Sequence, residues 1–151
     1  MVGHSVTFCM ASAGGFFLAS LLAGAWKYAC ISRSPEAKAP YYVDVAHRSA
    51  LMYAFACALL ALFCADNAWS TSVTLVSSAL LVAYFAVSVL GYVVHGALRD
   101  TENQLQRPHR LGSSTVPNGA MTAFMVSLIA AEIASFLIIL SGYIIRHVSR
   151  T

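Results

Sequence analysis

Few side chains within the apolar parts of this sequence are equipped for chemistry. His47 stands where a polar stretch gives way to an apolar one. Tyr92 and His95 close the next apolar stretch, and Glu132 lies near the middle of the last one. A neutral imidazole is a common ligand of iron, and a phenol can donate a hydrogen bond to a substrate oxygen. These residue types indicate a site that holds a metal or a polar substrate atom among apolar walls.

Two of these side chains also have a purely structural interpretation. A histidine at a membrane boundary is more often a hydrogen-bonded interfacial residue than a metal ligand. An intramembrane carboxyl group indicates a functional site by default, but it can also hold two helices together through a hydrogen bond. The residues alone leave both interpretations open for His47 and for Glu132.

Motifs of several other activities are missing from the sequence. It contains no HExxH, no Cys-His zinc spacing, no glycine-rich phosphate loop and no Gly-x-Ser-x-Gly. Hydrolysis and nucleotide chemistry are therefore unsupported. The four cysteines show no CxxC spacing, and thiols in apolar stretches behave as small hydrophobic groups.

Four apolar stretches must position the candidate residues. Of the 151 residues, 59% are hydrophobic and 10% are charged, whereas soluble domains are usually about one-quarter charged. Each stretch is about 20 residues long, enough for a helix to cross a hydrocarbon layer of about 30 Å. Lipid cannot satisfy backbone polar groups, so apolar runs of this length form helices. The sequence predicts one all-α integral membrane domain over 1–151, a four-helix transmembrane bundle with helices at about 6–26, 46–65, 71–95 and 118–146.

The positions of the basic residues predict the orientation of these helices. Most of them fall near the first and third loops, at Lys27, Arg33, Lys38, Arg48, Arg99, Arg107 and Arg110. The opposite side has only Arg146 and Arg150. Basic loops stay in the cytoplasm, so we expect a bacterial inner-membrane protein with both termini outside. The basic loops are expected to contact lipid headgroups, and nucleic-acid binding is not indicated.

Helix parity brings several candidate residues to one side of the membrane. His47, Tyr92 and His95 are predicted to lie at similar depth near the cytoplasmic surface. Asp44 is expected to cap the second helix, which places His47 in its first turn. The polar loop after His95, which includes Asn103, is interpreted either as a solvated connector or as a lid over a cytoplasm-facing pocket.

Three short motifs resemble styrene oxide isomerase, a family of small four-helix membrane proteins that assemble as trimers and hold haem b. They are Gly3-His4 with Phe8-Cys9, Ala46-His47 with Ala50-Leu51, and Gly91-Tyr92. The 45-residue interval from His47 to Tyr92 is similar to the family's interval between its haem-ligand histidine and its substrate-orienting tyrosine. The polar loop with Asn103-Gln104 is a looser similarity.

The resemblance implies roles for three residues. His47 would be the axial ligand of a haem b iron, and Tyr92 the active-site hydroxyl. The family has an asparagine six residues after the ligand, where this sequence has Tyr53. Six residues turn a helix through about 600°, so Tyr53 cannot share the face of His47. We therefore expect Tyr53 to be a catalytic side chain that addresses a haem held at a subunit interface of a homotrimer.

The implied activity is a redox-neutral isomerisation of an apolar epoxide to an aldehyde or ketone, with ferric haem as a Lewis acid. Two other classes stay open. One is a haem-binding electron-transfer or membrane-anchor subunit in which His47 and His95 are both axial ligands. The other is a glutathione-linked four-helix membrane enzyme, whose arginine and asparagine signatures are not convincingly present. His95, Asn103 and Glu132 are possible secondary site residues.

Overall fold

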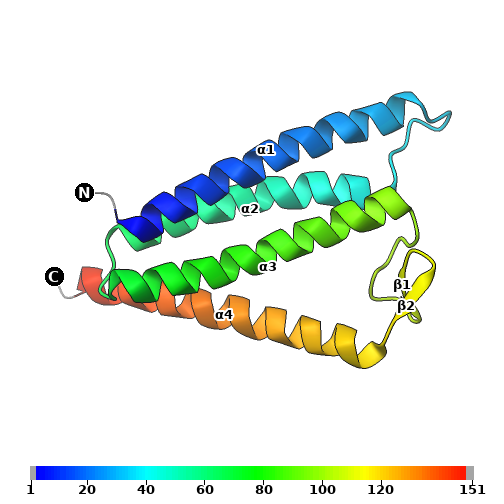
Figure 1. The fold of residues 1–151 in the computed structure, drawn as a ribbon. Helices are drawn as coiled ribbons and strands as arrows, with labels where there is room; N and C mark the ends of the chain where they lie inside the picture. Colours follow the sequence, from blue (N-terminus) through cyan, green and yellow to red (C-terminus); the bar gives the residue numbers. More distant parts are fainter. Residues whose placement is uncertain (1–2, 149–151) are drawn as a thin grey trace.

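Four long helices make up most of the chain (Figure 1). The computed structural model describes residues 3–148, so Arg150 lies outside the described residues. The helices are α1 (His4–Ser32), α2 (Tyr41–Ala65), α3 (Thr71–Leu98) and α4 (Asn118–Val148). All four are long and apolar enough to cross a membrane. The predicted all-α architecture with four candidate transmembrane helices is therefore confirmed.

The start of α2 differs from the prediction. The helix begins at Tyr41, directly after Pro40, rather than at residue 46. The prediction that Asp44 caps this helix is therefore wrong. Instead, the Asp44 carboxylate accepts ion pairs from Lys27 of α1 and, at 2.8 Å, from Arg48 one turn further along α2. The Lys27–Asp44 pair joins α1 to α2 at the ends predicted to be cytoplasmic, one turn before His47.

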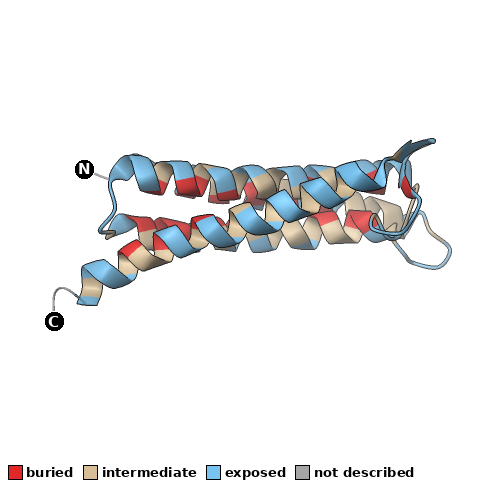
Figure 2. Cartoon of the chain, turned by 90° about the horizontal axis from the view of Figure 1, so that it is seen from below, coloured by how far each residue is buried: buried red, intermediate tan, exposed pale blue. Residues whose placement is uncertain are grey.

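Small side chains hold α1 against α2. Ala50, Ala54 and Cys57 of α2 are buried in one core cluster with Cys9 and Ala13 of α1. Such small residues let helix backbones approach closely where lipid supplies no hydrophobic driving force. Figure 2 shows the buried residues gathered between the helices, whereas large apolar side chains are exposed on the outer faces. The outer faces therefore have the composition of lipid-facing surfaces.

Helix α4 packs less deeply than the other three. Its buried residues are Ser135, Ile139 and Gly142, all in its second half. In Figure 1, α4 approaches α3 near the chain's C-terminal end and diverges from it toward the other end of the bundle. One end of α4 is therefore fixed, and the other is supported mainly by the loop before it.

The turn between α2 and α3 fixes the C-terminal half of α4. Asn67 donates hydrogen bonds to the carbonyls of Phe63 and Ile139, at 3.1 and 2.8 Å. The indole of Trp69 donates to the Ile138 carbonyl at 3.0 Å. Gly142 is required here, because a Cβ would overlap Asn67 and Trp69.

The loop between α3 and α4 is folded. It contains strands β1 (His109–Leu111) and β2 (Ser114–Val116), which pair antiparallel with His109 opposite Val116. Gly112 in the turn has a φ of +60°, a conformation that favours glycine. The sequence predicts either a solvated connector or a lid here, and neither prediction includes the hairpin.

Candidate functional site

His47 lies on the side of α2 that contacts α1. Its ring nitrogen Nδ1 is 2.8 Å from the backbone carbonyl oxygen of Ser20. The Ser20 hydroxyl in turn donates to the His47 carbonyl at 3.1 Å. Gly24, one turn after Ser20, leaves space for the imidazole, since a Cβ at this position would come within 3.0 Å of the His47 Cε1. Two positions of α1 therefore fix the orientation of this ring.

The contact with Ser20 determines which nitrogen of His47 is available. A carbonyl oxygen can only accept, so Nδ1 must carry the hydrogen. The neutral ring then has its lone pair on Nε2. Metal-ligating histidines almost always donate the hydrogen of their other ring nitrogen to a carbonyl or carboxylate in this way, which fixes the ring and raises its basicity. His47 is therefore prepared to offer Nε2 to a metal.

Tyr53 of α2 and Tyr92 of α3 both contact other aromatic rings. Tyr53 stacks on Phe85 of α3, with ring centroids 4.2 Å apart and planes 11° apart. Tyr92 stacks on Tyr42 at 5.8 Å. Tyr53 also packs against Phe16 of α1, with ring centroids 5.9 Å apart. The contacts of both tyrosines are therefore with aromatic rings, whereas those of His47 are with Ser20 and Gly24.

Tyr53, Tyr92 and Glu132 form one group between α2, α3 and α4. Tyr53 interacts electrostatically with Tyr92 and Glu132. Glu132 lines an apolar cavity beside this group, and its Oε1 is buried without a hydrogen-bond partner among the described residues. Glu132 could serve only to hold helices together if it formed a hydrogen bond to a neighbouring helix. Oε1 forms no such bond with any described residue.

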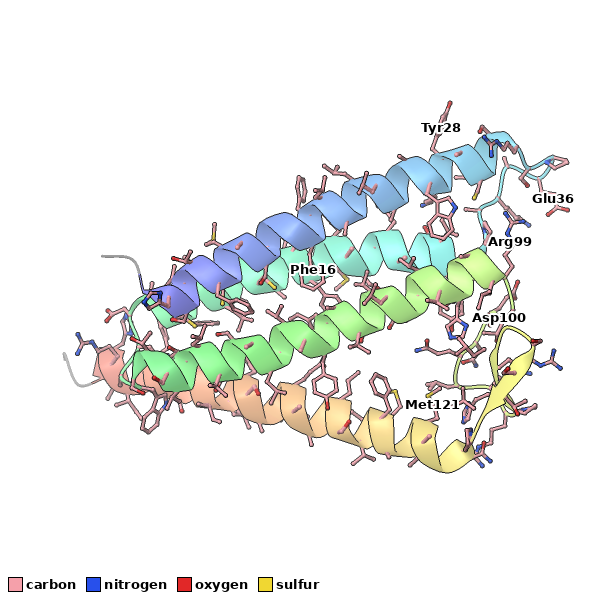
Figure 3. All side chains as sticks on the ribbon, in the orientation of Figure 1. Phe16, Tyr28, Glu36, Arg99, Asp100 and Met121 are labelled. Carbon is pink, nitrogen blue, oxygen red and sulfur yellow. The ribbon has the colours of Figure 1, made fainter. Side chains whose placement is uncertain are left out.

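His95 belongs to a different contact, which attaches the loop to α3. Its Nδ1 is 2.8 Å from Oδ1 of Asp100, and the other oxygen of Asp100 accepts from the Gly112 backbone. The His95 ring also packs against Tyr42, whose hydroxyl accepts from the Gln104 backbone at 2.6 Å. Figure 3 shows Asp100 between the end of α3 and the hairpin. We call this set of contacts the loop latch.

The charge of Asp100 is favoured by its partners. Burial alone would raise the pKa of the Asp100 carboxyl group. The hydrogen bond from Gly112 and the hydrogen bond and charge of His95 outweigh burial, so the pKa lies below its ordinary value. Asp100 is therefore an anion at neutral pH, and the latch is a charge-assisted contact.

Asn103 is a turn residue in the structure. Its side-chain oxygen accepts from the Leu105 backbone at 3.0 Å, and its own backbone donates to Thr101. The residue is exposed, and these contacts connect it neither with His47 nor with the two tyrosines.

Among residues 3–148, no three His, Cys, Asp or Glu side chains gather as a cage for a metal ion. A haem differs from a bare ion, because the macrocycle brings its own nitrogen ligands and the protein supplies one or two axial ones. His47 meets that smaller requirement. Sequence reasoning missed Ser20 and Gly24, although their spacing of one helical turn places both on one face of the first helix.

Comparison of the chain with models of protein families, with curated proteins and with solved structures finds no match.

Proposed function

We propose that this protein is a haem b-dependent membrane isomerase that converts an apolar epoxide to an aldehyde or ketone. The observation that carries the proposal is the hydrogen bond from His47 Nδ1 to the Ser20 carbonyl, which leaves Nε2 as an axial ligand. The motif resemblance to styrene oxide isomerase supplies the reaction class.

The surroundings of His47 fit a haem ligand. The ring is half-buried at the edge of the α1–α2 contact, and Gly24 keeps its near side free of side-chain bulk. Large apolar side chains, Met52 and Phe55 among them, are exposed on α2. A haem has broad apolar faces, and an exposed apolar helix surface can cover part of them.

The proposed chemistry divides between the group and the chain. When bound, ferric haem with one protein ligand would supply a Lewis acid that polarises an epoxide C–O bond without net electron transfer. Opening of that bond toward the carbon that better bears positive charge, followed by a 1,2-hydride shift, gives the carbonyl product. Tyr92 and Tyr53 would orient the substrate oxygen through their hydroxyls. Apolar walls would keep water away, so that the cation is not trapped as a diol.

The positions of the two half-sites support a site shared between subunits. His47 bonds to α1, whereas Tyr53 packs between Phe16 of α1 and Phe85 of α3. Tyr92 of α3 stacks on Tyr42, near the start of α2. In a ring-shaped homotrimer each copy presents one face to a different face of its neighbour. His47 of one copy would then hold the haem, and the tyrosines of the next copy would meet the substrate.

We also propose a bacterial inner-membrane location with the basic loops in the cytoplasm and both termini outside. The loop after α1 and the loop after α3 carry most of the basic residues, whereas the turn after α2 pairs Asp66 with Arg146 at 2.9 Å. This asymmetry is the one that the positive-inside rule describes.

The contacts of His95 argue against a second axial ligand in the same site. An electron-transfer or membrane-anchor subunit would need His47 and His95 on one haem. The His95 ring packs on Tyr42 and bonds to Asp100, whereas His47 contacts Ser20 and Gly24. One protein ligand, with the other axial position open, is the arrangement that these contacts support.

Absorption spectra of the protein purified in detergent test the proposal. We expect a Soret band that disappears in His47→Ala and persists in the control His4→Ala, with circular dichroism and elution volume unchanged in both. The ferric spectrum should shift when an apolar aryl epoxide is added. A wild-type protein without a Soret band would rule out haem altogether, and a band that survives His47→Ala would rule out this ligand.

The hydroxyl of Tyr92 is tested by Tyr92→Phe. We expect full haem content and a turnover of aryl epoxide that falls by about a hundredfold, the usual effect of removing one donor to a developing oxyanion. Loss of haem and activity in equal proportion would instead make Tyr92 a structural residue.

A further inference from the structure

An apolar cavity lies between α2, α3 and α4. Its volume is about 270 Å³. Its walls include two aromatic rings, Phe85 of α3 and Phe136 of α4, together with Ala56 and Leu59 of α2. An engineered cavity of about 150 Å³ in another protein binds benzene, so this one has room for a single ring with a short substituent. This volume lies just below the range of about 300–1,000 Å³ that is usual for pockets that bind drug-sized ligands.

One polar group interrupts these apolar walls. Oε1 of Glu132 is buried, and no described residue forms a hydrogen bond with it. A carboxylate has only acceptors, and a carboxylic acid keeps a carbonyl acceptor, so a ligand that donates a hydrogen bond can satisfy the Glu132 carboxyl group in either protonation state. An unsatisfied buried polar atom costs about 1–3 kcal/mol, which a bound donor would recover.

We propose that this cavity binds a small monocyclic aromatic molecule that carries one hydrogen-bond donor, as an aryl alcohol does, with the donor on Glu132 and the ring between Phe85 and Phe136. The rings supply edge and face contacts for an aromatic ligand. The acceptor inside an apolar wall supplies specificity, because ligands without a donor leave it unsatisfied. The open packing of α4 gives such a ligand lateral access from the lipid.

This site is separate from the His47 site and does not depend on haem. The cavity lies at α4, whereas His47 contacts α1. The two sites are connected through Phe85, which lines the cavity and stacks on Tyr53. The cavity thus adjoins the proposed substrate-orienting tyrosine but does not include His47. Photolabelling of the cavity does not require haem, so its outcome is distinguishable from that of the absorption spectra.

The experiment uses photolabelling of the whole protein in detergent micelles. The probe is a benzyl alcohol with a trifluoromethyl-diazirine group in the para position, and the control probe is the corresponding toluene, which lacks the hydroxyl. Labelled peptides are located by mass spectrometry. We expect the alcohol to label the cavity residues of α2, α3 and α4 about fivefold more than the toluene, as one net hydrogen bond predicts.

Three variants separate the contributions to binding. Glu132→Leu should reduce the labelling by the alcohol to that of the toluene, whereas Glu132→Gln keeps an acceptor carbonyl and should retain most of it. Ala56→Phe fills the cavity without touching the acceptor and should abolish labelling there by both probes. Circular dichroism and elution volume verify that each variant folds.

Three results would overturn the proposal. Equal labelling by both probes, or unchanged labelling in Glu132→Leu, would make the cavity an unspecific crevice for lipid chains. Cavity labelling that persists in Ala56→Phe would place the probe elsewhere. No cavity labelling by either probe would mean that a second copy of the chain or a tightly held lipid occupies the space.

Discussion

At the scale of single residues, the most consequential contact is between a histidine and a backbone carbonyl. His47 is in a helix that the sequence predicts, but its chemistry depends on α1. The Ser20 carbonyl fixes Nδ1 as the donor, and Gly24 provides the space that the ring occupies. The contacts to the His47 ring come from the Ser20 backbone and from the absence of a side chain at Gly24, so a search for reactive residue types passes over both positions.

Gly24→Val should displace the His47 ring. A Cβ at Gly24 would lie 3.0 Å from Cε1 and 3.1 Å from Nδ1, closer than ordinary contacts, and the γ-methyl groups of valine add further bulk. We expect haem content, measured as Soret absorbance per protein, to fall several-fold, with a smaller loss in Gly24→Ala. Gly15→Val is the matched control, because a Cβ there meets nothing within 4 Å. Full haem content in Gly24→Val would contradict the proposed ring position.

At the scale of elements, α4 is attached at both ends by different means. The turn after α2 fixes its C-terminal half through Asn67 and Trp69. The loop before it is attached to α3 by the loop latch, in which Asp100 accepts from His95 and Gly112. Between these two attachments α4 buries little of its surface. This middle part of α4 borders the cavity.

Asp100→Ala should release the hairpin from α3. The buried carboxylate satisfies the Gly112 amide, and a hydrogen bond to a charged group contributes about 1.5–3 kcal/mol, so hydrogen exchange of that amide should accelerate by at least about tenfold. Glu102→Ala, an exposed acidic neighbour, is the control. An unchanged exchange rate in Asp100→Ala would show that the hairpin is held by other contacts.

The same contact predicts a dependence on pH. The pKa of Asp100 is lower in the folded protein than its ordinary value of about 3.9, so the stabilisation is complete above that value. It is lost as the pH falls through the lowered folded value, when the carboxyl group takes up a proton. Protection of Gly112, corrected for the intrinsic exchange rate, should therefore be constant from neutral pH down to about 5 and decline only in strong acid. A decline that begins near neutral pH would contradict this assignment.

Gly142→Ala should weaken the attachment of α4 to the α2–α3 turn. The added Cβ would overlap the Asn67 side chain and the Trp69 ring, and overpacking of this kind costs about 1–3 kcal/mol. We expect a lower midpoint of unfolding in mixed micelles of increasing denaturing detergent. Gly119→Ala is the matched control, since a Cβ there meets nothing within 4 Å. Equal midpoints for the two variants would contradict the close approach at Gly142.

At the scale of the whole molecule, the proposed haem ligand and the proposed catalytic hydroxyls have different contact partners within one copy. Tyr53 and Tyr92 share a group with Glu132, and His47 faces α1. The proposed isomerase therefore requires a neighbour to complete the site. In a closed ring, every copy can offer His47 to one neighbour and the two tyrosines to the other.

Mixed trimers distinguish a shared site from one within a single copy. His47→Ala and Tyr92→Phe should each be nearly inactive alone. When both are co-expressed, a complete site forms wherever a copy with intact His47 precedes one with intact Tyr92, so each mixed trimer has one complete site of three and should show about a third of wild-type activity after purification over both tags. Activity that stays at the level of the single variants would place both residues in one copy. The two variants carry different affinity tags, so that purification over both tags verifies mixed assembly.

The sequence by itself determined the number, type and approximate positions of the helices. Apolar runs of this length form helices in lipid, because a helix satisfies the hydrogen bonds of its own backbone groups. The start of α2 was predicted too late because Asp44 was interpreted as a cap, whereas its carboxylate pairs with Lys27 of another helix.

Only the tertiary structure decided which partner each candidate side chain has. Similar depth in the membrane had placed Tyr92 and His95 beside His47, but depth says nothing about the direction in which a residue faces around its helix axis. That direction depends on how small residues let α1 approach α2, and on where a folded loop attaches. Three features depend on how the helices pack, and no single residue type predicts them: the contact of His47 with the Ser20 carbonyl, the space at Gly24 and the unpaired Oε1 of Glu132.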